Sequence, residues 1–226
     1  MKLLVKFIIL GLIIFNAISL KGQTFEPSVI ILLPNNTSAD EALQDEINSY
    51  NEMIDQSRER NIRSYEIVLL QEEDLAENEK IMFRKQMDFF DHLDYFGMAT
   101  SVSEAFLQYL FSEKYSNMLI FAVGEKAETE IDAFSALAEK HQTQFVLNFS
   151  DLRSYVYNGS KRSTVKIQLF DNKTKEILLN EEFIGDDHNP GFQFTCDEGT
   201  LSCTINNALS TAIIEVANLI HLRIKD

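Results

Sequence analysis

The sequence has no tryptophan, only three prolines and only eight glycines in 226 residues. Six of the glycines follow residue 23 and are scattered singly, so no glycine-rich loop is available to cradle a phosphate group. The motifs G-x-S-x-G, G-x-G-x-x-G and H-E-x-x-H and the Walker loop are also missing. These absences argue against nucleotide binding and against the common hydrolase and zinc-protease mechanisms. The lack of tryptophan also weakens a sugar-stacking surface.

Basic residues are scarce, with 20 Lys and Arg against 35 Asp and Glu, for a formal charge of −15. Without Lys2, Lys6 and Lys21, 17 basic residues face the 35 acidic ones, so the charge becomes −18. Nucleic acids and anionic membranes are bound by basic surfaces, so this balance excludes both as expected partners. Solubility explains the acidity, and attraction of a cation or a basic partner is the alternative.

The first 23 residues read as an export signal. Lys2 and Lys6 precede the apolar run 7–20, which ends at Lys21-Gly22-Gln23. The run is shorter than the roughly 20 residues of a spanning helix. We therefore expect a cleaved signal peptide over 1–23 and a single globular domain over 24–226. The mature chain would be periplasmic or secreted, with no transmembrane segment.

Only two cysteines occur, Cys196 and Cys203. Export would bring them into an oxidising compartment, which favours a disulfide bond that closes a short loop. A redox or metal-binding pair would need a tighter C-x-x-C spacing and further ligands. We therefore predict a structural disulfide.

The first part of the chain predicts an α/β fold, or a mixed α+β one. Pro34 ends the buried-strand run 29–33, and Ser38 with Glu41 forms a capping box for a helix to about residue 60. Ser101 with Glu104 forms a second capping box. Further strands are expected at 65–70, 118–123 and 144–149, with helices between them. The alternation predicts a largely parallel sheet with helices on both faces over residues 28–150.

The second part changes to antiparallel hairpins over 152–184. Three strand-like runs, 153–157, 164–170 and 176–184, are separated by Asn158-Gly159 and by the turn 171–174. An amphipathic helix from about Ile205 closes the chain. The run Thr164 to Asp171, a turn, a second strand and this helix resemble exported envelope modules of the TolB amino-terminal and CsgG type. That resemblance implies a mixed sheet and action through protein partners.

Two groups of side chains could bind a divalent cation. Asp88 and His92 stand four residues apart on an expected helix, sharing a face with Asp91 and Tyr95. Asp186, Asp187 and His188 follow one another in an expected loop, although they lack the alternating carboxylates of a calcium loop. A solvated acidic face and a polar turn are the alternative interpretations. No cofactor is predicted, and a divalent cation is the alternative.

Ligands of open parallel sheets bind outside the carboxyl ends of the strands. Here those ends carry Asn35, Glu72 and Glu125, so a bound group would be cationic, hydroxyl-rich or metal-bridged. Helix caps and solvated turns explain the same residues without a ligand. His141 is expected to cap the carboxyl end of its helix.

The leading hypothesis is a non-catalytic, exported protein-binding or envelope-assembly module. It would bind an envelope or extracellular protein through its hairpin edge or through the loop that Cys196 and Cys203 close. The alternatives are a metal-dependent hydrolase at one of the two candidate cation sites, and a small-ligand carrier at the strand ends. The sequence does not fix the oligomeric state.

Overall fold

The computed structural model describes residues 28–71, 77–112, 118–188 and 196–225. The expected signal peptide, 1–23, lies outside this range. The helical elements are η1 (Glu41–Leu43), α2 (Gln44–Gln71), α3 (Glu77–Asp91), α4 (Met98–Ser112), α5 (Ile131–His141) and α6 (Leu201–Lys225). The strands are β1 (Ser28–Ile31), β2 (Asn36–Ala39), β3 (Leu119–Ala122), β4 (Phe145–Tyr157), β5 (Ser160–Asp171) and β6 (Glu176–Asp186).

The strands of the described residues form one mixed, six-stranded sheet in the order β3-β1-β4-β5-β6, with β2 beside the distal half of β4. β1 pairs in parallel with β3 and β4, and β2 pairs in parallel with β4. β4, β5 and β6 are antiparallel. The predicted fold class is confirmed: a parallel half is extended by antiparallel hairpins and closed by a C-terminal helix.

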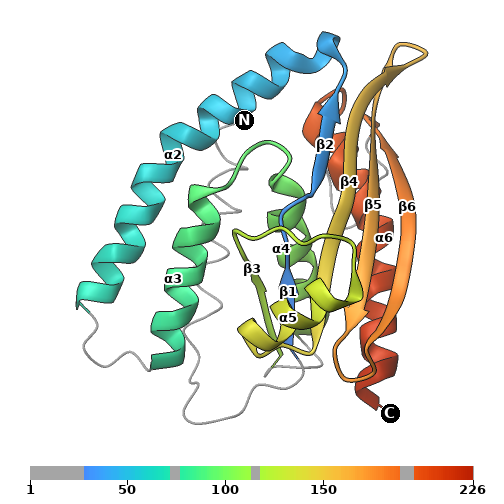
Figure 1. Ribbon diagram of the computed structural model, residues 1–226. Coiled ribbons are helices and arrows are strands. Elements are labelled where there is room, and N and C mark those ends of the chain that lie inside the picture. The colour runs from blue at the N-terminus through green and yellow to red at the C-terminus, as the bar shows by residue number, and fades with distance from the viewer. Residues whose placement is uncertain (1–27, 72–76, 113–117, 189–195, 226) are drawn as a thin grey trace.

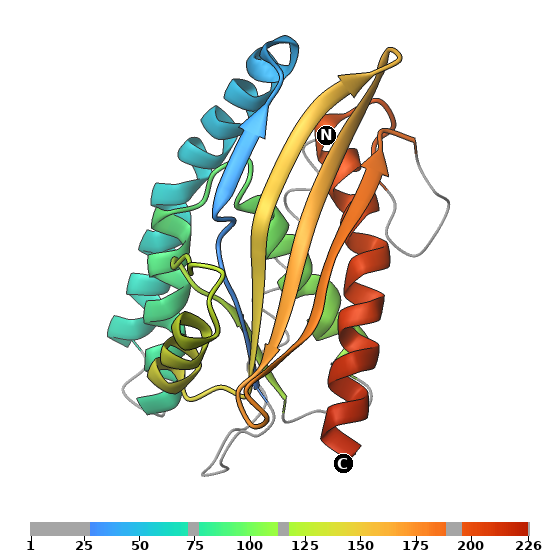
Figure 2. The ribbon, with the colours of Figure 1, turned by 45° about the vertical axis from the view of Figure 1, so that its right-hand side comes forward.

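Helices cover both faces of the sheet, as the alternating elements predict (Figure 1). On one face, α4 and α6 pack against Val29, Ile31 and the inward residues of β4 and β5. On the other face, Phe134 and Ala138 of α5 pack against Ile30 and Val146. β1 is buried on both faces because its side chains alternate between these two clusters. α2 and α3 lie beside the sheet, on the side of β3 (Figures 1 and 2).

The hairpin half is longer than expected. The sequence suggests two strands, 144–149 and 153–157. The structure has the single strand β4 from Phe145 to Tyr157, with a register shift between Phe149 and Asp151. β4 therefore pairs with β1 along its first half and with β2 along its second. The Asn158-Gly159 turn is confirmed, and both residues have the positive φ that this hairpin turn requires (51° and 83°).

The expected strand over 65–70 is wrong, because this run forms the last turns of α2. A short apolar run has no periodicity that separates a strand from a helix. The position beside β1 that the extra strand would take belongs to β3.

Both expected capping boxes are also wrong. Ser38 lies in β2, where the extended β4 recruits residues 36–39 as a parallel neighbour. α4 begins at Met98, so Ser101 and Glu104 lie inside the helix and not at its start. Glu104 is fully buried there, a position at which a carboxylate needs a hydrogen-bond partner.

Candidate functional site

The face of the hairpin strands that points away from α6 carries polar, charged and aromatic side chains. The strand register places three cross-strand rows on it: Arg153–Thr164–Ile184, Tyr155–Arg162–Asp186 and Asp151–Lys166–Glu182. We call these nine residues the hairpin face. Ile184 is 58% exposed. No described helix lies over the distal half of this face (Figures 1 and 2).

Two arginines on the hairpin face lie against tyrosine rings at the tip of the β4–β5 hairpin. The guanidinium of Arg153 is 5.3 Å from the centroid of Tyr155, and that of Arg162 is 4.6 Å from the centroid of Tyr157. Tyr157 is still 51% exposed. The Nε atom of Arg162 is buried and has no hydrogen-bond partner among the described residues. Arginine and tyrosine held in this way are the residue types that dominate protein interfaces.

The predicted disulfide between Cys196 and Cys203 is confirmed. It closes the segment that leads into the N-terminus of α6. Lys161 of β5 joins this segment to α2, because its Nζ donates to Glu46 (2.6 Å) and to the carbonyl of Gly199 (2.7 Å). Glu46 also accepts the backbone N–H of Leu201 at the first residue of α6. The loop is therefore held against both the hairpin and α2.

Asp186, Asp187 and His188 lie where β6 ends. The Nδ1 atom of His188 is 3.3 Å from the Asp187 carboxylate and 3.7 Å from that of Asp186. Asp187 also accepts the backbone N–H of Lys161, and Asn207 of α6 donates to the carbonyls of Asp186 and His188. These contacts shape a turn, and a cation there stays a prediction. Within the described residues, no three His, Cys, Asp or Glu side chains are arranged to hold a metal ion.

The two outer edges of the sheet differ in whether side chains occupy their backbone groups. At β3, Gln108 of α4 donates to the carbonyl of Ile120 (3.1 Å), and Glu104 of α4 accepts the backbone N–H of Ala122. Two side chains thus occupy the edge groups that a neighbouring strand would use. At the opposite edge, β6 pairs only with β5 among the described residues.

The predicted strand-end residues are partly brought together. Leu33 donates its N–H to the carbonyl of Glu125 (2.8 Å), and the amide of Asn35 donates to the carbonyl of Ala127. Asn35 and Glu125 therefore flank one edge, as expected for neighbouring parallel strands. Glu72 lies outside the described residues. The strand expected just before it is the end of α2, so Glu72 does not follow a strand.

The Glu125 carboxylate already accepts hydrogen bonds from two side chains. Its carboxylate accepts from Lys140 (2.9 Å) and from Nε2 of His141 (2.6 Å), both at the end of α5. Burial alone would raise the pKa of Glu125, but these two hydrogen bonds outweigh burial and lower it. Burial and the charge of Lys85 lower the pKa of His141, so its imidazole is neutral at pH 7. His141 thus binds Glu125 at the end of its helix, where the sequence predicts only a helix cap.

Asp88 and His92 lie against Gly124, next to this cluster. A Cβ atom on Gly124 would come within 2.8 Å of the Asp88 carboxylate and of Nδ1 of His92. That Nδ1 atom lies 2.8 Å from the backbone carbonyl oxygen of Asp88 and is hydrogen-bonded to it, and not to the Asp88 carboxylate. The expected shared face with Tyr95 is wrong, because α3 ends at Asp91 and Tyr95 is fully buried.

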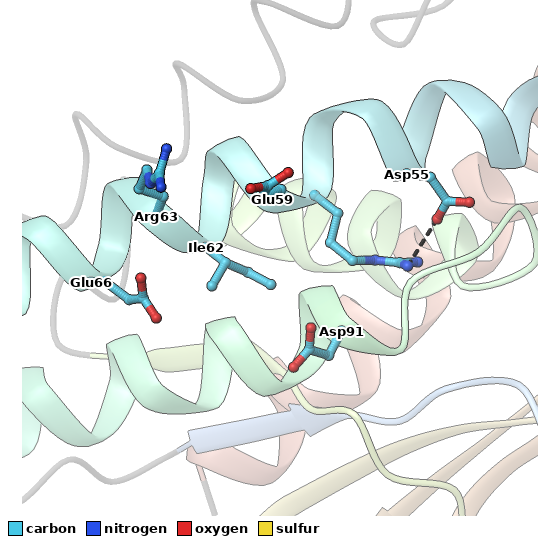
Figure 3. Close-up of a pocket in the computed structure, with 7 residues that line it drawn as sticks. Asp55, Glu59, Ile62, Arg63, Glu66 and Asp91 are labelled. Carbon is cyan, nitrogen blue, oxygen red and sulfur yellow. Dashed lines mark ion pairs between the residues drawn. The ribbon is translucent and has the colours of Figure 1, made fainter.

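The described residues also line two hollows. One, of about 400 Å³, lies between α2 and α3 and is lined by four carboxylates, two arginines and Ile62 (Figure 3). Arg58 spans it, because it pairs with Asp55 (2.8 Å) and donates to the carbonyls of Phe90 and Leu93. The other, of about 710 Å³, lies between α5, β6 and α6, with Ile131, Leu219 and Leu222 in its lining.

Sequence reasoning missed Glu104, Gln108 and the two arginine–tyrosine pairs. Glu104 and Gln108 stand four residues apart in an apolar segment, so their spacing would place both on one helix face. Arg153 and Tyr155 stand two apart, as do residues on one face of a strand. Neither spacing reveals which strand lies opposite.

No protein-family model and no curated protein sequence matches this chain. Among solved structures, the chain is similar to the PelC dodecamer from Paraburkholderia phytofirmans (TM-score 0.36, 9% identity, 83% of this chain and 89% of that one). It is also similar to lipoprotein GNA1162 from Neisseria meningitidis (TM-score 0.33, 11% identity, 85% and 99%). A third is the C-terminal domain of LpoB from Salmonella enterica (TM-score 0.24, 9% identity, 73% and 85%). These neighbours thus include a lipoprotein, and scores this low assign neither family nor function. None of the described helices has the length and apolar character of a membrane span.

Proposed function

We propose that this chain is an exported envelope module that acts by binding another protein through its hairpin strands, and that it is not an enzyme. The observation that carries the proposal is the contrast between the two sheet edges. Glu104 and Gln108 occupy the edge of β3, whereas no described residue pairs with the outer edge of β6. An exposed strand edge is an aggregation hazard unless it is protected or used. β6 is 11 residues long.

The composition of the hairpin face supports the same function. Arg153, Tyr155, Arg162 and Ile184 lie together on it, with Tyr157 at its end. Tyrosine and arginine supply most of the binding free energy at many interfaces, because each combines a large contact area with hydrogen bonds. The apolar Ile184 beside them gives the face an anchor for a partner.

The test is partner capture from the native envelope. Tagged mature protein is cross-linked and purified, and the co-eluting proteins are identified by mass spectrometry. We expect one stoichiometric partner, and we expect Arg153→Ala with Tyr155→Ala to reduce its capture about tenfold or more, as loss of interface hot spots does. Tyr109→Ala, which removes an exposed aromatic side chain from α4, is the matched control. Failure of the wild type to retain any partner would contradict the proposed function.

The disulfide loop is the second surface that this function could use. Replacing Cys196 and Cys203 by Ser removes the covalent closure but leaves the contacts of Lys161 and Glu46 in place. If the loop contacts the partner, this variant loses capture while circular dichroism and thermal unfolding report a folded protein. Unchanged capture would restrict the interface to the hairpin strands.

A small-ligand carrier is the second candidate function. Nδ1 of His141 and Oδ1 of Asn35 are both buried acceptors without a donor among the described residues. Both residues flank the segment 124–127. A hydroxyl-rich or cationic ligand would supply the missing donors. Titration calorimetry with a panel of polyols and polyamines, on wild type and His141→Phe, tests this function: binding that the variant loses would support it, and no heat from any compound would contradict it.

A further inference from the structure

We infer that the outer edge of β6 binds an extended, lysine- or arginine-bearing segment of another protein, which joins the sheet as an additional strand. This inference rests on the proposed function and specifies the chemistry of the partner. It is carried by the open edge, by the alternation of side chains along β6 and by the position of two glutamates.

The open edge is long enough for strand addition. β6 pairs with β5 in continuous register from Leu179 to Asp186. The carbonyl of Asp186 is bound by Asn207, which leaves 179–185 as the available stretch. Every second residue of an edge strand points its N–H and C=O groups outward. A guest strand would satisfy these groups with backbone hydrogen bonds, as in other sheets that are extended by a peptide.

The side chains along this stretch alternate between two environments. Asn180, Glu182 and Ile184 pair with Gln168, Lys166 and Thr164 on the side away from α6. Glu181 and Phe183 point to the side of α6, where Phe183 packs on the edge of the core. A guest strand would extend the side-chain rows on both faces, so it needs an apolar side chain beside Phe183 or Ile184 and a charged one beside Glu181 or Glu182.

Charge decides which partner fits. Glu181 and Glu182 are both exposed, and neither forms an ion pair with a described residue. Because adjacent residues of a strand point to opposite faces, each face of the edge carries one glutamate at its middle, and Glu182 has Lys166 of β5 as its cross-strand neighbour. A Lys or Arg opposite either glutamate is favourable, whereas a second acidic strand is repelled. Twofold antiparallel pairing of β6 with a copy of itself, centred on the stretch 179–185, would place Glu182 opposite Glu182, so the same charges disfavour self-association.

The experiment uses the mature protein and three synthetic peptides of equal length. One alternates Val with Lys, one alternates Val with Glu, and the third repeats the Val-Lys sequence with alternate backbone nitrogens methylated to prevent strand pairing. Binding is followed by fluorescence anisotropy, and hydrogen exchange of the β6 amides locates the peptide. We expect the Val-Lys peptide to bind and to protect 179–185. The Val-Glu and methylated peptides should bind more weakly by a factor of about ten or more. The Val-Glu peptide lacks the charge attraction, and the methylated peptide lacks the backbone hydrogen bonds.

The variant Glu181→Lys with Glu182→Lys should reverse the preference, so that the Val-Glu peptide binds better than the Val-Lys peptide. Glu52→Lys with Glu59→Lys changes the net charge equally on α2, at the opposite side of the molecule (Figure 1), and should preserve the original order. Equal binding of the methylated peptide, no binding of the Val-Lys peptide, or an unchanged preference in the β6 variant would each overturn the inference.

The native partner separates this inference from the proposed function. If wild type captures a partner and the Glu181→Lys, Glu182→Lys variant captures it equally well, strand addition by a basic segment is wrong and partner binding stands. If wild type sediments as a dimer whose β6 amides are protected at the interface, the occupant is a second copy and the inference is overturned. Loss of capture in the β6 variant but not in the α2 control supports both.

Discussion

Glu104 of α4 and Ala122 of β3 are joined by a hydrogen bond from the backbone N–H of Ala122 to the buried carboxyl group of Glu104. Gln108, one turn further along α4, donates to Glu104 (3.3 Å) and to the carbonyl of Ile120 (3.1 Å). A helix thus supplies both the acceptor and the donor that a neighbouring strand would provide. This arrangement protects β3 from pairing with another chain.

The first prediction concerns the pH dependence of stability. Burial raises the pKa of Glu104 from 4.5 to about 7, although the hydrogen bond from Ala122 lowers it in part. The folded protein therefore holds this proton more tightly than the unfolded chain. The stabilisation from this group is complete below about pH 4.5 and is lost as the pH rises to about 7, by about 3 kcal/mol in total. Urea unfolding of wild type and Glu104→Gln at about pH 5 and pH 8 measures it.

The difference between the two proteins isolates Glu104 from groups with the opposite sign. The pKa values of Glu125 and His141 are both lowered, so their contributions to stability fall as the pH falls. Both groups are present in wild type and variant and cancel in the comparison. We expect Glu104→Gln to gain stability relative to wild type on going from about pH 5 to pH 8. A difference that does not change with pH would show that Glu104 does not titrate in this range.

The second prediction concerns Gly185 of β6, which lies against the backbone of α6. A Cβ atom on Gly185 would overlap the carbonyl oxygen of Thr204 and the backbone nitrogen of Ala208. Backbone atoms of a helix cannot move aside as a flexible side chain can, so Gly185→Ala should destabilise the fold by about 3 kcal/mol. Gly159→Ala is the control: its Cβ meets open space, and only the positive φ of 83° opposes it, at about 1 kcal/mol. Chemical denaturation measures both, and equal losses would contradict the packing explanation.

Short-range signals predicted those parts of the fold that depend on neighbouring residues. The apolar run at Val29 gives β1, Asn158-Gly159 gives the hairpin turn, and the apolar stripe from Ile205 gives α6. Each signal is complete within a few residues, because turn geometry and amphipathic periodicity are local. The expected export and the short separation of the two cysteines were likewise enough to predict the disulfide bond.

Elements that depend on distant partners could not be predicted in this way. Ser38 with Glu41 and Ser101 with Glu104 have the same spacing as a true capping box, but β4 recruits Ser38 and β3 binds Glu104. The helical end of α2 over 65–70 has the composition of a strand. The candidate interface has the same difficulty, because Arg153 and Ile184 become neighbours only through the register of three strands.

The third prediction concerns a chain of buried hydroxyl groups that crosses the sheet from Tyr95 to α6. The Tyr95 hydroxyl is 3.1 Å from Ser154, Ser154 is 2.9 Å from Ser163, and Ser163 is 2.5 Å from Thr204. Thr204 donates to the carbonyl of Leu201. Because that donation fixes the direction of the chain, each hydroxyl donates to the next one toward α6.

Because of this direction, removing the Ser163 hydroxyl and removing the Tyr95 hydroxyl should cost different amounts of stability. Ser163→Ala leaves the buried Ser154 hydroxyl without its acceptor and should cost about 2 to 3 kcal/mol, the penalty of an unsatisfied buried donor. Tyr95→Phe removes only a donor, since Ser154 can still donate to Ser163, and should cost about 1 kcal/mol. Urea unfolding of the two variants measures the difference. A larger loss for Tyr95→Phe would mean that the hydroxyls point the other way.

The last prediction tests whether Glu181 and Glu182 keep β6 from pairing with another copy. Replacing both by Thr retains a strand-forming residue and removes the repulsion that twofold pairing would create. The variant should therefore self-associate more than wild type, with a sedimentation coefficient that rises with protein concentration. Glu52→Thr with Glu59→Thr on α2 reduces the net charge equally and should sediment as wild type does. If the β6 and α2 variants behave alike, general charge and not the edge controls association. If only the β6 variant associates and its β6 amides become protected from hydrogen exchange, the two glutamates are what reserves this edge for a basic partner.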